Sequence, residues 1–151
     1  AFGMRVLIAK RDDTVFDTSR YSFEDLLPQV DVLSLHCPLT DANEHMINQD
    51  SLKLMKPTAF VINTARGKLV NSLDLISALE HGIIAGAGID VLDSEPPQQD
   101  EVLTSAAARL DNLFVTPHNA WGARESRIRL IQQTRENILG YISGNMIRVV
   151  N

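Results

Sequence analysis

Cysteine, aromatic residues and long apolar runs are all scarce in this chain. Its 151 residues include one cysteine, Cys37, and 5% aromatic residues. A single cysteine cannot form an internal disulfide, so we expect a reducing, cytoplasmic location. No apolar run approaches the ~18 residues of a membrane span, and the first residues lack the basic and apolar regions of a signal peptide. We therefore expect no membrane partner.

Positive charge and metal-ligand patterns are lacking as well. The formal net charge is −5, so the chain has no excess of the basic residues with which proteins bind nucleic acid. His36, His45 and His81 show no metal-ligand spacing with one another. We expect neither a nucleic-acid partner nor a metal site.

Short apolar runs alternate along the chain with segments that carry helix signals. The runs are near-continuously apolar, as in strands that are covered on both faces. They are Met4–Ala9, Asp31–Leu35, Ala59–Ile62, Gly86–Leu92 and Leu113–Thr116. The alternation predicts a single α/β domain with a parallel sheet and helices on both faces.

Capping residues and breakers set the limits of the predicted helices. These signals are Ser22 and Pro28 for a short first helix, Asn48 before Asp50–Met55, Asn71 or Ser72 with Gly82 for a third helix, and Gly144 after Arg124–Ser143. We expect the stretch Asp93–Asn112 to be irregular, and loops of this length in compact domains are usually functional or disordered.

Ligands of open α/β sheets bind beyond the carboxyl ends of the strands. The residues at the predicted strand ends are Lys10-Arg11, HCPLT (36–40), NTARG (63–67), Asp90 and PHNAW (117–121). Arg66 has the planar guanidinium that suits capture of a carboxylate. An equally weighted alternative is that Arg66 fastens its own loop by bonding backbone carbonyls.

His118 and Glu95 are candidates for acid–base chemistry. The ordinary pKa of histidine, ~6.5, suits a general acid or base, although most single histidines are structural. A carboxylate bonded to the ring would favour its charged form, but Glu95 before two prolines is also typical of a solvated turn.

Asp90 and Cys37 each allow two interpretations. Asp90 lies in an apolar run, so its carboxylate must either be bonded, for instance by capping the next turn, or face a ligand. Cys37 is more typical of a small buried apolar residue than of a nucleophile, because no lysine or arginine lies beside it in sequence to support a nucleophilic thiol.

The segments HCPLT, INTARG, GAGIDVLDSEPP and TPHNAW together resemble the signature segments of the D-isomer-specific 2-hydroxyacid dehydrogenases, in order and spacing, along essentially the whole chain. The segments AFGMRVLIAKR, LLPQVDVLSLHCPLT and LMKPTAFVINTARG are most similar to the glycerate dehydrogenase and hydroxypyruvate reductase branch. The resemblance implies a Rossmann-type doubly wound sheet, a nicotinamide coenzyme and a small 2-hydroxy or 2-oxo acid as substrate.

The resemblance also implies roles for individual residues. Arg66 would bind the substrate carboxylate and carbonyl, His118 would exchange a proton with the carbonyl oxygen, and Glu95 would keep His118 protonated and oriented. Asp90 would bind the nicotinamide carboxamide. The other residues expected to line the coenzyme are Cys37, Pro38, Thr64, Ala65, Asn119 and Ala120.

Two features depart from the family pattern. Lys10-Arg11 stands where NAD enzymes place a ribose-binding acid, which favours NADP over NAD. Asp12 or Asp13 is an alternative ribose ligand, which keeps NAD open. The glycine-rich fingerprint G-x-G-x-x-G is also missing. We therefore expect residues 1–151 to be a partial dinucleotide-binding domain that lacks its first βα unit and a separate substrate domain.

We therefore expect an NAD(P)-dependent oxidoreductase that is, by analogy, a homodimer. The isolated 151-residue chain is expected to be inactive or nearly so, because it lacks the backbone N–H groups that bind the pyrophosphate. One alternative is a non-catalytic, coenzyme-sensing protein of the corepressor kind on the same scaffold. Another is a dehydrogenase for phosphite or formate.

Overall fold

The computed structural model describes residues 3–10, 19–119 and 122–149. The chain forms two compact units, residues 1–118 and residues 119–151. Among the described residues, no helix combines the length and the apolar character that crossing a membrane requires.

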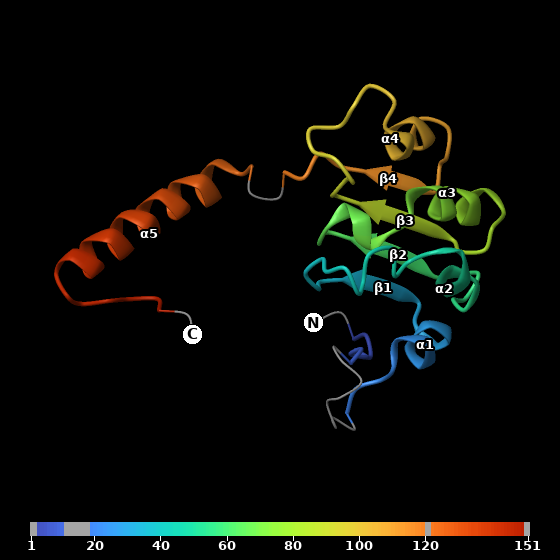
Figure 1. Ribbon diagram of the computed structural model, residues 1–151, viewed down its shortest axis with the longest axis horizontal. Helices are drawn as coiled ribbons and strands as arrows, with labels where there is room; N and C mark the ends of the chain where they lie inside the picture. The colour runs from blue at the N-terminus through green and yellow to red at the C-terminus, as the bar shows by residue number, and fades with distance from the viewer. Residues whose placement is uncertain (1–2, 11–18, 120–121, 150–151) are drawn as a thin grey trace. The chain divides into compact units, whose positions relative to one another are not determined.

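A parallel four-stranded sheet is the centre of the first unit (Figure 1). Its strands are β1 (Val32–Leu35), β2 (Phe60–Asn63), β3 (Gly86–Ile89) and β4 (Leu113–Val115), and they lie side by side in chain order. The register aligns Leu35 with Asn63, Asn63 with Ile89, and Ile89 with Val115. The carboxyl ends of the strands consequently share one edge of the sheet, and the predicted parallel α/β fold is confirmed.

Short helices connect the strands. They are α1 (Phe23–Leu26), the 3-10 helix Leu27–Gln29, α2 (Gln49–Lys53), the 3-10 helix Gly67–Leu69, α3 (Ser72–Glu80) and α4 (Val102–Ala107). The cap of α3 is Asn71, whose side chain accepts a hydrogen bond from the Asp74 amide. Asn48 caps α2 in a reciprocal capping box with Ser51. The predicted caps thus begin these helices.

Two expectations about the secondary structure are wrong. The run Met4–Ala9 forms only an isolated bridge, between Ala9 and Tyr21, rather than a strand along its length. A strand exists through its neighbours, and in the described structure β1 pairs with β2 and not with this run. The stretch Asp93–Asn112 is not irregular throughout, because it contains α4.

The core of the first unit lies between one face of the sheet and helices α2, α3 and α4. Leu33, Val61, Ala87 and Leu113 line that face and are buried together with Leu52, Leu75 and Leu103 from the three helices. On the other face, Val32, Phe60 and Phe114 are exposed, the last with 70% of its surface. Burial therefore alternates along β1 and β2, unlike the near-continuous burial that their sequences suggest.

The second unit consists mainly of α5 (Arg124–Ile142). None of the described side chains of α5 is buried, and its apolar residues Ile128, Ile131 and Ile138 are exposed. Ser143 is the C-cap of the helix, and Gly144 follows with a φ of 74°, a conformation that glycine adopts without strain. The predicted end of the last helix is confirmed.

Candidate functional site

His118 and Glu95 meet at the carboxyl edge of the sheet. His118 follows β4, Glu95 belongs to the loop after β3, and Nδ1 of the histidine lies 2.6 Å from Oε2 of the glutamate. An ionised carboxylate can only accept, so Nδ1–H donates. The other carboxylate oxygen, Oε1, accepts from the Leu92 amide at 2.9 Å. Both interpretations of Glu95 therefore hold in part: its carboxylate bonds the ring, and the residue is exposed in a turn.

Hydrogen bonding stabilises the charged form of Glu95. The bond from His118 is the largest cause that lowers the pKa of this carboxyl, and the Leu92 N–H is the next. The charge of Arg66 lowers the same pKa further, which places Arg66 within electrostatic range of the pair. The three side chains, although far apart in sequence, thus share one edge of the sheet.

The backbone at His118 is unusual. Its φ of 49° lies in the left-handed region, where a side chain with a Cβ is strained. Such conformations persist only where the surroundings determine them, and they gather at functional sites. Here the strained residue is the one that presents its ring to Glu95.

The side chain of Asn63 holds the loop that carries Arg66 through hydrogen bonds to the loop backbone. This side chain is fully buried at the end of β2. Its Nδ2 donates to the Arg66 carbonyl at 2.8 Å, and its Oδ1 accepts from the Ala65 amide at 3.0 Å. Arg66 itself is exposed, and its Nη1 donates to the Ala65 carbonyl at 2.6 Å. Both interpretations of Arg66 therefore find support: it bonds its own loop and still presents an exposed guanidinium.

Asp90 joins the ends of β3 and β4. The Thr116 hydroxyl donates a hydrogen bond to Oδ1 of Asp90, and the Asp90 amide donates to the Asn63 carbonyl at 2.9 Å. The carboxylate is thus bonded across the sheet, rather than to the following turn. Its second oxygen, Oδ2, remains an acceptor of the kind that an amide N–H needs.

The other candidate residues differ in exposure and in their contacts. Cys37 is half-buried, and the next residue, Pro38, accepts through its carbonyl from Nδ2 of Asn43 at 2.8 Å. Thr64 is exposed and Ala65 half-buried. The Lys10 amide donates to the Tyr21 carbonyl at 2.8 Å. Asn119, in the second unit, accepts from the Gly122 amide. Arg11, Asp12, Asp13 and Ala120 lie outside the described residues.

Three residues that support the site are not predicted as such from the sequence. Asn63 is predicted only as part of a strand end, and neither Asn43 nor Thr116 is a predicted site residue. A buried polar side chain needs a partner, so an asparagine that ends an apolar strand is a signal that could have pointed to Asn63. Thr116 and Asn43 carry no comparable signal, because their partners follow from strand register and loop shape.

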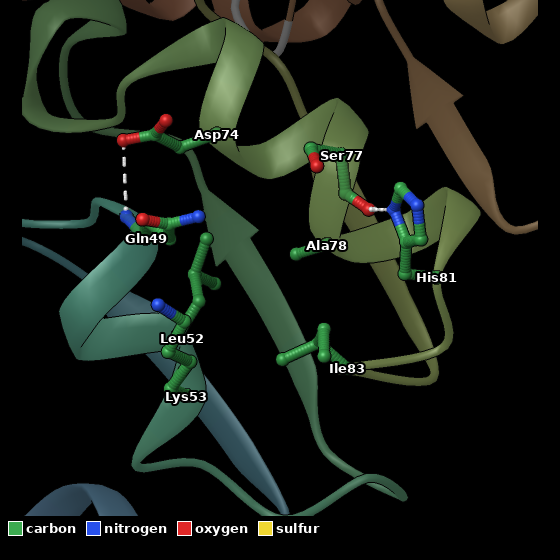
Figure 2. A pocket seen from close by; sticks show the side chains of 8 residues that line it. All are labelled: Gln49, Leu52, Lys53, Asp74, Ser77, Ala78, His81 and Ile83. Carbon is green, nitrogen blue, oxygen red and sulfur yellow. Dashed lines mark hydrogen bonds between the residues drawn. The ribbon is translucent and has the colours of Figure 1, made fainter.

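A groove of about 300 Å³ lies between α2 and α3, away from this edge. Figure 2 shows Leu52, Ala78 and Ile83 along it, with Gln49 and Asp74 at one end and His81 at another. Lys53 and His81 belong to segments that lead toward the amino ends of β2 and β3. The groove and the Glu95–His118 pair therefore occupy different places in the fold. Within the described residues, no group of three or more His, Cys, Asp or Glu side chains could hold a metal ion.

Comparisons with known proteins agree on one family. The model of the D-isomer specific 2-hydroxyacid dehydrogenase, NAD binding domain, matches residues 1–120. A glycerate dehydrogenase of Methylorubrum extorquens is 41% identical over 99% of this chain and 46% of its own length. A hydroxypyruvate reductase of Blautia hydrogenotrophica is 36% identical over 100% of the chain and 47% of its own length.

A solved structure shows the same relation. The NAD-complexed D-isomer specific 2-hydroxyacid dehydrogenase of Lactobacillus delbrueckii ssp. bulgaricus superposes with a TM-score of 0.75 at 32% identity. The superposition covers 92% of this chain and 47% of the other. The chain thus spans about half the length of the relatives it matches.

Proposed function

Because the chain belongs to the family of D-isomer-specific 2-hydroxyacid dehydrogenase NAD-binding domains, we propose that it carries the acid–base pair and a substrate-binding arginine of an NAD(P)-dependent oxidoreductase. The reaction interconverts a small D-2-hydroxy acid and its 2-oxo acid, of the glycerate and hydroxypyruvate or glyoxylate type. The observation that carries the proposal is the 2.6 Å contact between His118 and Glu95 at the carboxyl edge of the sheet.

His118 is the proposed proton donor to the substrate carbonyl oxygen. Its Nδ1 is held by Glu95, so Nε2 is the ring atom that exchanges a proton with the substrate. The Glu95 carboxylate stabilises the protonated ring and fixes its orientation. In the oxidative direction the neutral ring takes the proton from the hydroxyl group.

Arg66 is the proposed anchor of the substrate carboxylate. One of its nitrogens bonds the Ala65 carbonyl, and the guanidinium has further N–H groups in a planar fork that matches a carboxylate. Since Asn63 holds the backbone of this loop from within the core, the guanidinium is presented from a fixed base. This arrangement orients the substrate toward the imidazole.

The residues at the carboxyl edge suit a nicotinamide coenzyme, which supplies the hydride when bound. Asp90 offers Oδ2 as an acceptor for the carboxamide group. Further proposed lining residues are Cys37, Pro38, Thr64, Ala65, Asn119 and Ala120. Lys10 and Arg11 favour the 2′-phosphate of NADP, since two cations attract a phosphate at the place where NAD enzymes use an acid.

The coenzyme proposal is tested by comparing kcat/KM for NADPH and NADH in the whole protein. We expect a higher value with NADPH, and a Lys10→Ala variant that lowers the NADPH value while changing the NADH value less. Equal values for the two coenzymes would contradict the NADP preference.

We also propose that residues 1–151 supply part of a dinucleotide-binding domain, since the chain spans 46–47% of the length of its relatives. The isolated chain is then expected to show little or no turnover. We also propose a cytoplasmic location and, by family analogy, a homodimer, for which the exposed isoleucines of α5 offer apolar surface. Sedimentation equilibrium tests the dimer, which a monomer at all concentrations would contradict.

The deciding experiment for the function is hydroxypyruvate reduction by the whole protein, followed by consumption of the reduced coenzyme. We expect turnover that a His118→Ala substitution removes almost entirely. Coenzyme binding without turnover of any 2-oxo acid would contradict the enzyme proposal and would favour the coenzyme-sensing, corepressor-like alternative.

A further inference from the structure

Gly67 brings two parts of the candidate site into direct backbone contact. It follows Arg66 and is buried. A Cβ placed on Gly67 would lie 2.1 Å from the Leu92 carbonyl carbon, 2.2 Å from its oxygen and 2.5 Å from the Asp93 nitrogen. The Cα of Gly67 is therefore packed against the peptide bond that joins Leu92 to Asp93.

This peptide bond belongs to the turn that orients Glu95. The Leu92 amide, at the start of the turn, donates to Oε1 of Glu95 at 2.9 Å, and Oε2 of Glu95 contacts the His118 ring. A continuous series of contacts thus runs from the Arg66 loop through Gly67 and the Leu92 backbone to the Glu95–His118 pair.

We propose that Gly67 is a positioning residue, which sets the distance between the Arg66 loop and the turn that aims Glu95 at His118. The inference rests on the proposed function, because it assigns the spacing between substrate-binding arginine and acid–base pair to this contact. The obstacle to any larger residue is backbone on the opposite side, which cannot rotate away as a side-chain end can.

The size of the expected displacement follows from the same distances. Ordinary van der Waals contact begins at 3.4 Å, so a methyl group at position 67 must push the two backbones apart by about 1 Å. A misplacement of about 1 Å in an active site can lower the rate by about 10²-fold.

The test on the isolated chain is the NMR titration of the Glu95 carboxyl carbon. In the Gly67→Ala variant we expect the pKa of Glu95 to rise toward the usual value, because the Leu92 N–H moves away from Oε1. Gly88→Ala is the matched control. Its Cβ meets only the Cδ1 of Ile62, at 3.2 Å, so the titration should stay as in the unmodified chain. An unchanged titration in Gly67→Ala would overturn the proposal.

A measurement on the unmodified chain covers the case in which Gly67→Ala does not fold. Nuclear Overhauser effects should connect the Gly67 α-protons with the Asp93 amide proton, since the backbones touch there. Their absence in a folded chain would overturn the proposal without any substitution.

The whole protein separates this inference from the proposed function. Gly67→Ala is expected to lower kcat by about 10²-fold with little change in the coenzyme KM, while Gly88→Ala leaves both unchanged. If the unmodified protein lacks dehydrogenase activity but the Glu95 titration shifts in Gly67→Ala, the function fails and the positioning role stands. If the protein is active and Gly67→Ala changes neither kcat nor the titration, the positioning role fails alone.

Discussion

The loops after β2 and after β3 lie at the same edge of the sheet but are held in different ways. The first is fastened by a side chain inside the core, since Asn63 is fully buried and bonds both Ala65 and the Arg66 carbonyl. The second is held at the surface, where Glu95 bonds the Leu92 amide and His118.

Because the two loops are held differently, substitutions in them should affect different properties. Removing a buried group with two hydrogen bonds leaves backbone donors and acceptors without partners, which costs free energy of folding. Removing one member of an exposed ion pair costs little folding free energy, because water screens it. We therefore expect substitutions in the first loop to affect folding and binding, and those in the Glu95–His118 pair to affect mainly the rate.

The largest effect is expected from His118→Ala. Loss of the proposed proton donor should lower kcat by ~10²–10⁴-fold, the usual contribution of general acid–base catalysis, with little loss in Tm. Steady-state kinetics and thermal unfolding of the whole protein provide the measurements. His81→Ala, in the groove between α2 and α3, is the control and should leave kcat unchanged. A loss of rate in both variants would contradict the assignment to His118.

The second largest effect is expected from Arg66→Lys. A lysine keeps the charge but lacks the planar fork, so bidentate binding of the substrate carboxylate is lost. Hydrogen bonds to charged groups contribute about 1.5–3 kcal/mol, which corresponds to a loss of about 10- to 100-fold in kcat/KM. Lys68→Arg, at an exposed cation paired with Glu44, should be neutral. Equal kcat/KM values in Arg66→Lys and the unmodified protein would refute the anchoring role.

Asn63→Ala tests the buried side of the comparison. We expect the free energy of unfolding to fall by about 1–3 kcal/mol, the cost of leaving buried polar groups unpaired. Urea titration of the isolated chain measures it. Asn43→Ala removes a side chain that also bonds loop backbone but is less buried, and it should cost less. If the two variants are equally stable, burial is not what distinguishes the first loop.

The smallest effect is a pH dependence of opposite sign at two neighbouring carboxyls. The pKa of Glu95 is lowered, chiefly by its bond with His118. The Glu95 carboxylate therefore stabilises the folded chain at pH values above its usual pKa, and this contribution is lost as the pH falls through the lowered pKa. The pKa of Asp93 is raised, chiefly by burial. Protonation of Asp93 therefore increases the free energy of unfolding as the pH falls through that raised pKa.

Urea unfolding between pH 3 and pH 7 of two isosteric variants separates these contributions. Glu95→Gln should lose less stability on acidification than the unmodified chain, whereas Asp93→Asn should lose more. Both effects are small because the two groups are partly exposed. Parallel curves for all three chains would show that neither carboxyl is linked to folding.

The sequence predicts the sheet better than its flanks. Apolar runs separated by capping residues specify parallel strands, because strands in such a sheet are buried and helices need caps. Met4–Ala9 has the same composition but no ladder, since pairing depends on a neighbour that composition does not reveal. Helix α4 is not predicted from the sequence, because its N-cap is Glu101, whereas Ser, Thr, Asp and Asn are the usual N-cap residues.

The sequence predicts the main residues of the candidate site, but not the contacts that hold them in place. Motifs that resemble one enzyme family identified Arg66, Glu95 and His118 as a set. Glu95 and His118 are 23 positions apart in sequence, and only the fold brings them together. The Asp90–Thr116 bond depends on the register of β3 and β4, and the Gly67 contact depends on how closely two loops approach. Such distances are properties of tertiary packing, which local sequence does not encode.

The left-handed backbone at His118 implies that the chain gives up thermodynamic stability in order to display an imidazole. The same dihedral angles cost a residue with a Cβ about 1–2 kcal/mol more than they cost glycine. A His118→Gly protein should accordingly melt at a higher temperature than its His118→Ala counterpart, although both lack the proposed proton donor. For folding stability alone a glycine would be the better residue at this position, so the histidine there agrees with the proposed acid–base role.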